Sequence, residues 1–200
     1  MSKDFIPFKN IGLCFSGGGY RATFFSLGVV SYYDKIQYQG KPLLDHVEAI
    51  STVSGGTLFG VAFSKASQQK DFDFKTFFNE FYDNFKPGND KLLETAIAKL
   101  GDDQVWKNNP HKKRSLINSF ALTYADMDVY KGSFDLFLDK EQLSNLKYVC
   151  FNSTEFSFGL AFRFQNCGMF ANKPLNNKHL NELEGQLQLG DITASSSCFP

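Results

Sequence analysis

The sequence predicts an α/β fold built around a mostly parallel sheet. Two short apolar runs, residues 11–15 and 47–53, each stop at a glycine-rich turn, and a helical stretch follows each turn at once. Two strand–turn–helix units near the start of a chain are typical of parallel sheets with right-handed crossovers. The chain has 200 residues, 42% hydrophobic and 21% charged, which is enough to build one domain with a sizeable core.

The first half of the chain supplies these two units and one aromatic helix. The helices are expected over residues 20–35 and 56–68. Between residues 71 and 85 the aromatic side chains recur with the spacing of one helix face, and the opposite face is mainly acidic. An acidic face is unsuited to anionic lipid, so we expect the aromatic face to pack in the core or under a lid rather than to enter a bilayer.

The second half predicts two further helices and two strands. The helices are expected over residues 91–100 and 112–126, with Gly101 and Pro110 as breaks. The strands are expected over residues 147–151 and 158–164, on either side of Asn152-Ser153-Thr154. A last helix is expected to start at Thr193.

Charge and cysteine usage exclude several classes of protein. Lysine plus arginine equals aspartate plus glutamate at 21 each, so no general attraction to nucleic acid is expected. The cysteines are scattered, with no CxxC pair, which suggests neither a zinc site nor a disulfide framework; they are Cys14, Cys150, Cys167 and Cys198. Neither a signal peptide nor a membrane-spanning run is visible. We therefore expect a cytoplasmic protein, with at most a peripheral contact with membranes, and no cofactor.

Ser54 is the strongest candidate nucleophile. A serine hydroxyl becomes reactive when a sharp strand-to-helix turn exposes it beside a base and oxyanion donors. The local sequence TVSGG at residues 52–56 supplies such a turn, although Thr52 occupies the first glycine position of G-x-S-x-G. The alternative is a serine that simply caps an ordinary helix.

The run Gly17-Gly18-Gly19 between a strand and a helix is a candidate anion site. Its backbone N–H groups lie at a helix N-terminus, where a phosphate or an oxyanion is stabilised, and Arg21 adds a charged donor. Residues 17–22 also fit the dinucleotide pattern G-x-G-x-x-A. That alternative needs an acidic residue closing the second strand, and this strand ends in Ser54 instead.

Together the two turns carry a family resemblance. SGGGYRA at residues 16–22 followed by ISTVSGGTLFG at residues 50–60 resembles the patatin-like phospholipases and their cytosolic phospholipase relatives. Residues 151–156 with Gly159 look like the family's strand segment after a helical insert, and residues 194–200 look like its Ala-Ser-x-Ala-x-Pro segment. The resemblance spans residues 1–200 as the N-terminal portion of a single domain, with residues 71–145 as a divergent helical insert.

This resemblance implies a three-layer fold with a mostly parallel central sheet, and a lipid acyl hydrolase. Gly17, Gly18 and Gly19 would form the oxyanion hole, Arg21 would bind substrate, and Ser54 would attack the acyl carbonyl of a phospholipid or another lipid ester. The family's base is an aspartate in an Asp-Gly-Gly or Asp-Gly-Ala motif. The histidines then need no catalytic role; they are His46, His111 and His179.

The chain departs from the family pattern at this base, because no Asp-Gly pair occurs in the 200 residues. We expect that the sequence is truncated at its C-terminus, that the dyad aspartate lies beyond residue 200, and that the 200-residue chain alone is nearly inert. Asp191 is a conceivable substitute, but a cap or surface role is the simpler expectation. The alternative function is a catalytically incomplete lipid- or anion-binding module that uses the same glycine loop.

Overall fold

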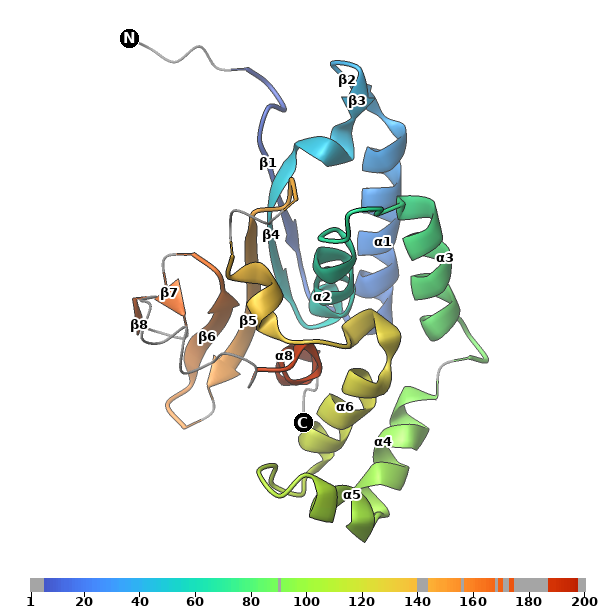
Figure 1. The fold of residues 1–200 in the computed structure, drawn as a ribbon, viewed down its shortest axis with the longest axis vertical. Coiled ribbons are helices and arrows are strands. Elements are labelled where there is room, and N and C mark those ends of the chain that lie inside the picture. The colour runs from blue at the N-terminus through green and yellow to red at the C-terminus, as the bar shows by residue number, and fades with distance from the viewer. Residues whose placement is uncertain are drawn as a thin grey trace.

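The fold centres on a four-stranded sheet. The computed structural model describes residues 6–89, 91–139, 144–155, 157–167, 169–170, 173–174 and 187–197. The strand order is β1-β4-β5-β6 (Figure 1). Its strands are β1 (Ile11–Phe15), β4 (Val47–Val53), β5 (Tyr148–Glu155) and β6 (Leu160–Gln165). The first three run parallel and β6 is antiparallel to β5, which confirms the mostly parallel sheet expected from the sequence.

Helices flank this sheet. The larger ones are α1 (Gly19–Lys35), α2 (Gly55–Ala66), α3 (Phe74–Phe85), α4 (Leu92–Gly101), α6 (Leu116–Asp126) and α8 (Leu189–Ser197). Both α2 and α8 pack on the sheet, while α1 and α3 stand outside α2 (Figure 1). The helix α2 lies between the sheet and the helices α1 and α3, and its residues from Gly55 to Ser64 are all buried.

Burial alternates along the strands and identifies the face that the helices cover. Leu13 and Phe15 of β1, Ile50 of β4, and Val149 and Phe151 of β5 are buried. The intervening positions are more open, which is the period-two pattern of a sheet packed more tightly on one face. Helices α2 and α8 supply the apolar side chains that complete this core.

The aromatic helix α3 packs in the core. Phe74, Phe77, Phe81 and Phe85 are all buried, so the expected packing of this face in the core is confirmed. Rings of α3 surround Phe59 of α2, with centroid separations of 6.1 Å to Phe77 and 5.8 Å to Phe81. Asp73 caps the helix by accepting the Thr76 N–H at 2.8 Å.

Three sequence expectations need correction. The helix expected from Lys112 begins at Leu116, because Ser115 caps it by accepting the Asn118 N–H at 3.3 Å. Asn152 is not in a connection but inside β5, paired with Val53 on one side and Arg163 on the other. The last helix begins at Leu189 rather than at Thr193.

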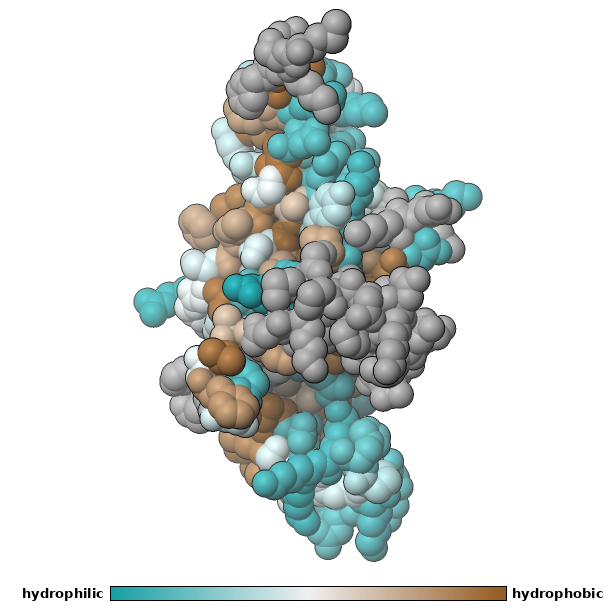
Figure 2. All heavy atoms as spheres, turned by 90° about the vertical axis from the view of Figure 1, so that its left-hand side faces the viewer, coloured by the Kyte–Doolittle hydropathy of each residue, from teal (hydrophilic) through white to brown (hydrophobic). Residues whose placement is uncertain are grey.

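Smaller elements complete the described chain. They are α5 (Asp103–Asn108), the pairs β2 (Gln37–Tyr38) with β3 (Lys41–Pro42) and β7 (Met169–Phe170) with β8 (Lys173–Pro174), and the 3-10 helices η1 (Leu43–His46), η2 (Asp128–Tyr130) and η3 (Phe134–Phe137). Among the described residues no helix is long and apolar enough to cross a membrane. Figure 2 views the molecule from the side of β6, and its lower end, over α4 and α5, is hydrophilic.

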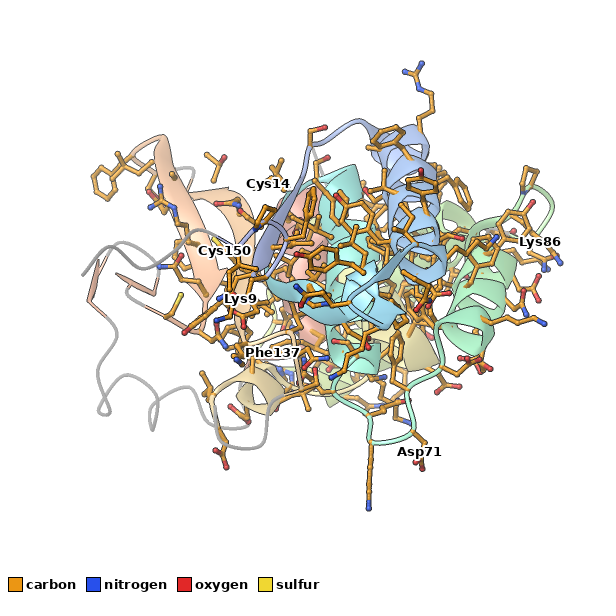
Figure 3. The ribbon with its side chains drawn as sticks, turned by 90° about the horizontal axis from the view of Figure 1, so that it is seen from above. Lys9, Cys14, Asp71, Lys86, Phe137 and Cys150 are labelled. Carbon is orange, nitrogen blue, oxygen red and sulfur yellow. The ribbon has the colours of Figure 1, made fainter. Side chains whose placement is uncertain are left out.

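Two cysteines lie in one row across the sheet. Cys14 of β1 and Cys150 of β5 both pair in register with Ser51 of β4, and Figure 3 shows them on neighbouring parts of the sheet. Since adjacent strands are about 4.8 Å apart, these thiols are separated by roughly two strand spacings, too far for a disulfide. Cys14, Cys150 and Cys167 are free. Cys198 and His179 lie outside the described residues.

Candidate functional site

Ser54 lies in the turn that joins β4 to α2. Its backbone has φ 54° and ψ −122°, a conformation that a residue with a side chain rarely adopts. Such strain costs about 1–3 kcal/mol and persists only where the surrounding structure enforces it. The carbonyl of Ser54 accepts the N–H groups of Thr57 at 2.7 Å and Leu58 at 3.2 Å, so the turn opens directly into the helix. The side chain caps no N–H of α2, which removes the simple capping interpretation.

A distant serine holds this turn in place. The backbone N–H of Ser54 donates to Ser196 Oγ of α8 at 2.9 Å. The same oxygen lies 2.6 Å from the carbonyl oxygen of Asn152 and 2.8 Å from Thr57 Oγ1. Ser196 therefore joins the turn, the sheet and α2 through one hydroxyl group. Beside it, Ser153 Oγ donates to the carbonyl of Ser195 at 2.6 Å, which fixes α8 against β5.

The glycine loop lies beside Ser54. A Cβ atom placed on Gly17 would be 3.0 Å from Ser54 Cβ and 3.5 Å from Ser54 Oγ. A Cβ atom on Gly55 would be 2.2 Å from the carbonyl oxygen of Gly19, so only glycine at position 55 permits this approach. Gly18 and Gly19 have φ of 142° and 59°, and both are exposed. The two glycine turns seen in the sequence thus meet at one place.

Two helix N-termini converge here. Helix α1 begins at Gly19 and α2 at Gly55, and neither carries an acidic residue in its first turn. The first N–H groups of each helix lack intrahelical partners, and the helix dipoles add positive potential. Thr23 ties the two helices together by placing its Oγ1 2.7 Å from the carbonyl of Gly55. This arrangement can stabilise an anion or a developing oxyanion.

Thr52, the departure from G-x-S-x-G, is accommodated by Gly60. Thr52 is buried, and its Oγ1 lies 2.9 Å from Thr57 Oγ1. A Cβ atom on Gly60 would lie 2.5 Å from Thr52 Cγ2, so the glycine leaves the space that the threonine methyl fills. Thr52 of β4 and Gly60 of α2 are therefore complementary in size, and the two elements pack closely at this point.

Arg21 lies in the first turn of α1 and is exposed. It lines a surface pocket of about 400 Å³ together with Gly17, Gly18 and Phe25. A guanidinium at this place can pair with a phosphate or a carboxylate that reaches the glycine loop.

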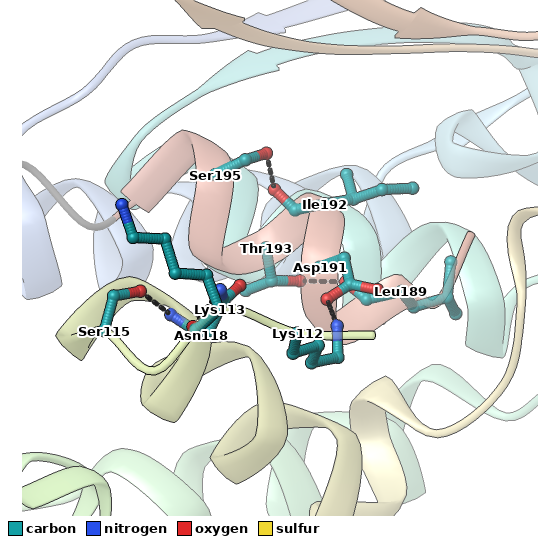
Figure 4. A network of polar contacts seen from close by, with 9 residues as sticks. All are labelled: Lys112, Lys113, Ser115, Asn118, Leu189, Asp191, Ile192, Thr193 and Ser195. Atoms are coloured by element: carbon teal, nitrogen blue, oxygen red, sulfur yellow. Dashed lines mark hydrogen bonds and ion pairs between the residues drawn. The ribbon is translucent and has the colours of Figure 1, made fainter. Parts of the chain in front are cut away.

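Asp191, for which a cap or surface role is expected, lies in the first turn of α8. Its side chain is partly exposed, and its carboxylate pairs with Lys112 (Figure 4). Ser196 contacts the serine turn from the other end of the same helix, five residues on, a rise of about 7.5 Å. Asp191 is therefore held at the far end of α8 from Ser54.

The two described histidines and the Cys150 thiol have surroundings of their own. His46 stacks edge-on against Tyr38 with ring centroids 5.3 Å apart, and His111 is exposed. Burial raises the pKa of the Cys150 thiol, so this thiol is less ionised at neutral pH than an ordinary cysteine. No group of metal-binding side chains is present in the described part of the chain.

Sequence reasoning missed Ser196 and Thr57 as members of the site. Ser196 is 142 residues from the N–H that it accepts, and it lies in a run of three serines with no local feature to distinguish it. Its only signal was its position inside the 194–200 segment that resembles the family.

The fold and these turns define an α/β protein with a serine at a strand-to-helix turn, facing a glycine loop between two helix N-termini. The chain belongs to the patatin-like phospholipase family: the family described as "Patatin-like phospholipase" matches residues 13–199. Membership places the chain in a family of lipid acyl hydrolases. No curated protein and no solved structure matches the chain significantly.

Proposed function

We propose that this protein hydrolyses phospholipid or other lipid acyl esters through an acyl-enzyme on Ser54. The observation that carries the proposal is the strained Ser54 turn beside the glycine loop. Ser54 Oγ would lie only 3.5 Å from a Cβ atom placed on Gly17. A carbonyl carbon that Ser54 attacks would place its oxygen toward the N–H groups of the Gly17–Gly19 loop. That loop would act as the oxyanion hole.

In the proposed reaction Ser54 Oγ adds to the acyl carbonyl carbon and gives up its proton to a carboxylate base. The tetrahedral intermediate expels the alcohol of the lipid, which takes the proton, and water then releases the fatty acid. The convergent helix N-termini favour the negative oxygen of this intermediate. Arg21 would hold an anionic group of the substrate near the loop.

Asp191 is not the proposed base, because Lys112 already engages its carboxylate at the opposite end of α8. We propose instead an aspartate outside these 200 residues. Asp191→Asn should then leave the rate of ester hydrolysis unchanged in a form of the protein that includes this aspartate. Loss of activity in Asp191→Asn would contradict this assignment.

The test of the function is hydrolysis of a nitrophenyl acyl ester and of a phospholipid by wild type and Ser54→Ala, both in a form of the protein that includes the proposed aspartate. We expect Ser54→Ala to abolish hydrolysis while the melting temperature stays within a few degrees of wild type. Ser16→Ala is the matched control, since Ser16 is an exposed serine in the same loop region. Equal activity of Ser54→Ala and wild type would refute the mechanism. Loop-dependent anion binding without any hydrolysis would favour the binding-module alternative.

A further inference from the structure

Asn152 occupies the last pair of the ladder between β4 and β5, opposite Val53, the residue that precedes Ser54. Asparagine is depleted in strands, because its side chain competes with the backbone for hydrogen bonds. A β-branched residue would fit the pleated surface of the sheet better at this position. The asparagine is half-buried and lies at the edge of the sheet where the serine turn begins. Strand formation therefore does not explain this residue type, whereas its contacts do.

The side-chain amide of Asn152 holds the end of β4. Its Nδ2 donates to the carbonyl oxygen of Thr52 at 3.0 Å and to Ser51 Oγ at 3.1 Å. A carbonyl oxygen only accepts hydrogen bonds, so the nitrogen of the amide, and not its oxygen, must face β4. Both acceptors lie just before the serine turn. The amide thus joins β5 to the last residues of β4 by contacts that the backbone ladder does not supply.

The main chain of the same residue is connected to the turn beyond Val53. The carbonyl oxygen of Asn152 lies 2.6 Å from Ser196 Oγ, and this oxygen accepts the Ser54 N–H at 2.9 Å. Asn152 is therefore connected to the chain on both sides of Val53. The left-handed backbone of Ser54, with φ 54°, persists only where its surroundings over-determine it. The two connections from one residue supply such a constraint.

The thiol of Cys150 favours the same orientation of the Asn152 amide. Cys150 Sγ lies 3.7 Å from Asn152 Oδ1 and 3.3 Å from Gln165 Oε1, so two amide oxygens face this sulfur. Burial raises the pKa of the thiol, which therefore keeps its proton at neutral pH and can donate it to these oxygens. With Oδ1 on the side of the thiol, Nδ2 lies on the side of β4.

We propose that Asn152 is a positioning residue for the reaction of Ser54: its amide fixes the end of β4 and thereby the strained turn that presents the serine hydroxyl. The inference rests on the proposed function and deepens it. Asn152 acts through backbone atoms of β4 and through Ser196, and it takes no part in the proton transfer. Acyl transfer slows strongly when the attacking oxygen is displaced by even about 1 Å. The amide should therefore affect the reaction rate at Ser54 more than the stability of the fold.

The substitution that tests this is Asn152→Val, made in a form of the protein that includes the proposed aspartate. Valine has a higher strand propensity than asparagine, which offsets the lost hydrogen bonds, so the melting temperature should stay within about 4 °C of wild type. Deuterium exchange of the peptide that carries the Ser54 N–H should accelerate at least about tenfold, because the turn opens more often. Fluorophosphonate labelling of Ser54 should slow at least about tenfold.

Thr154→Val is the matched control. Thr154 lies on the same strand, is exposed, and pairs with Ala161 of β6 beyond the last pair between β4 and β5. The control should change the exchange rate and the labelling rate by less than about twofold. If Asn152→Val does not fold, Asn152→Thr, which also introduces a β-branched residue, carries the same expectations.

Unchanged exchange of the turn, or unchanged labelling, in Asn152→Val would overturn the proposal. So would a larger fall in melting temperature with exchange rising equally across the sheet, because that result indicates a purely structural role. Exchange is measured without any reaction at Ser54. Faster exchange of the turn in Asn152→Val, together with a wild type that never labels, would therefore refute the proposed function alone.

Discussion

Ser196→Ala is the substitution that most sharply probes how the serine turn is held. It removes a single oxygen that accepts the Ser54 N–H and lies within hydrogen-bonding distance of the Asn152 carbonyl and Thr57 Oγ1. Alanine retains the helix propensity of α8 and fits the same space. The variant therefore leaves the packing intact and removes only the polar connection between α8 and the turn.

The magnitude follows from the groups that lose their partner. An unsatisfied buried donor or acceptor costs about 1–3 kcal/mol. The Ser54 N–H and the Asn152 carbonyl are the affected groups, and both contacts are part-buried, which favours the lower end of that range. We expect a loss of about 2 kcal/mol in the free energy of unfolding, a fall of roughly 4–8 °C in melting temperature for a chain of this size.

The assay pairs urea unfolding with the rate of fluorophosphonate labelling, both measured on a form of the protein that includes the proposed aspartate. Labelling should slow about ten- to a hundredfold, because the strained turn loses one of the contacts that orient Ser54. Ser196→Thr keeps the hydroxyl and should recover most of both losses. Ser195→Ala is the control, since Ser195 Oγ donates only within α8, to the Ile192 carbonyl at 2.9 Å. If Ser196→Ala and Ser195→Ala unfold and label alike, the reasoning is wrong.

Three further predictions concern the fold around the site. Gly60→Ala should destabilise by about 1–3 kcal/mol, because its Cβ would lie 2.5 Å from Thr52 Cγ2, and adding Thr52→Ser should recover most of the loss in a double-mutant cycle. Phe81→Ala should cost about 3–5 kcal/mol in urea unfolding, since the ring is fully buried; a loss below about 1 kcal/mol would argue against core packing of α3. The Thr76 hydroxyl and N–H lower the pKa of Asp73, so its stabilising effect is present above the unfolded pKa and is lost as the pH falls through the folded pKa. Asp73→Asn, which still caps α3, should therefore show a shallower loss of stability in acid, and an unchanged acid profile would contradict this cause.

The parts of the fold that the sequence predicted well are those with strong local signals. The apolar runs of β1 and β4 are each followed by a glycine-rich turn, which marks the end of the strand. The aromatic residues of α3 recur with helical spacing over the whole length of the helix. Local chemistry also predicted the Ser54 turn and the glycine loop as strand-to-helix turns, because both combine a strand end, small residues and a helix start. These features depend on neighbours in the chain.

The parts that the sequence did not predict depend on distant partners. Asn152 has low strand propensity, yet it lies inside β5 because neighbouring strands pair with it on both sides. Asp191 is held by Lys112 from another segment, and Ser196 reaches a turn more than a hundred residues away. Only the three-dimensional arrangement brings such groups together, and no periodicity in the sequence encodes it.

The central claim is that Ser54 is the nucleophile, and it is tested most directly by adduct mapping after a form of the protein that includes the proposed aspartate is treated with an alkyl fluorophosphonate. We predict a single phosphonyl adduct on the peptide that contains Ser54, which is absent in Ser54→Ala and retained in Ser16→Ala. Preferential modification of another serine, or the same labelling rate for the folded and the urea-unfolded chain, would contradict the account.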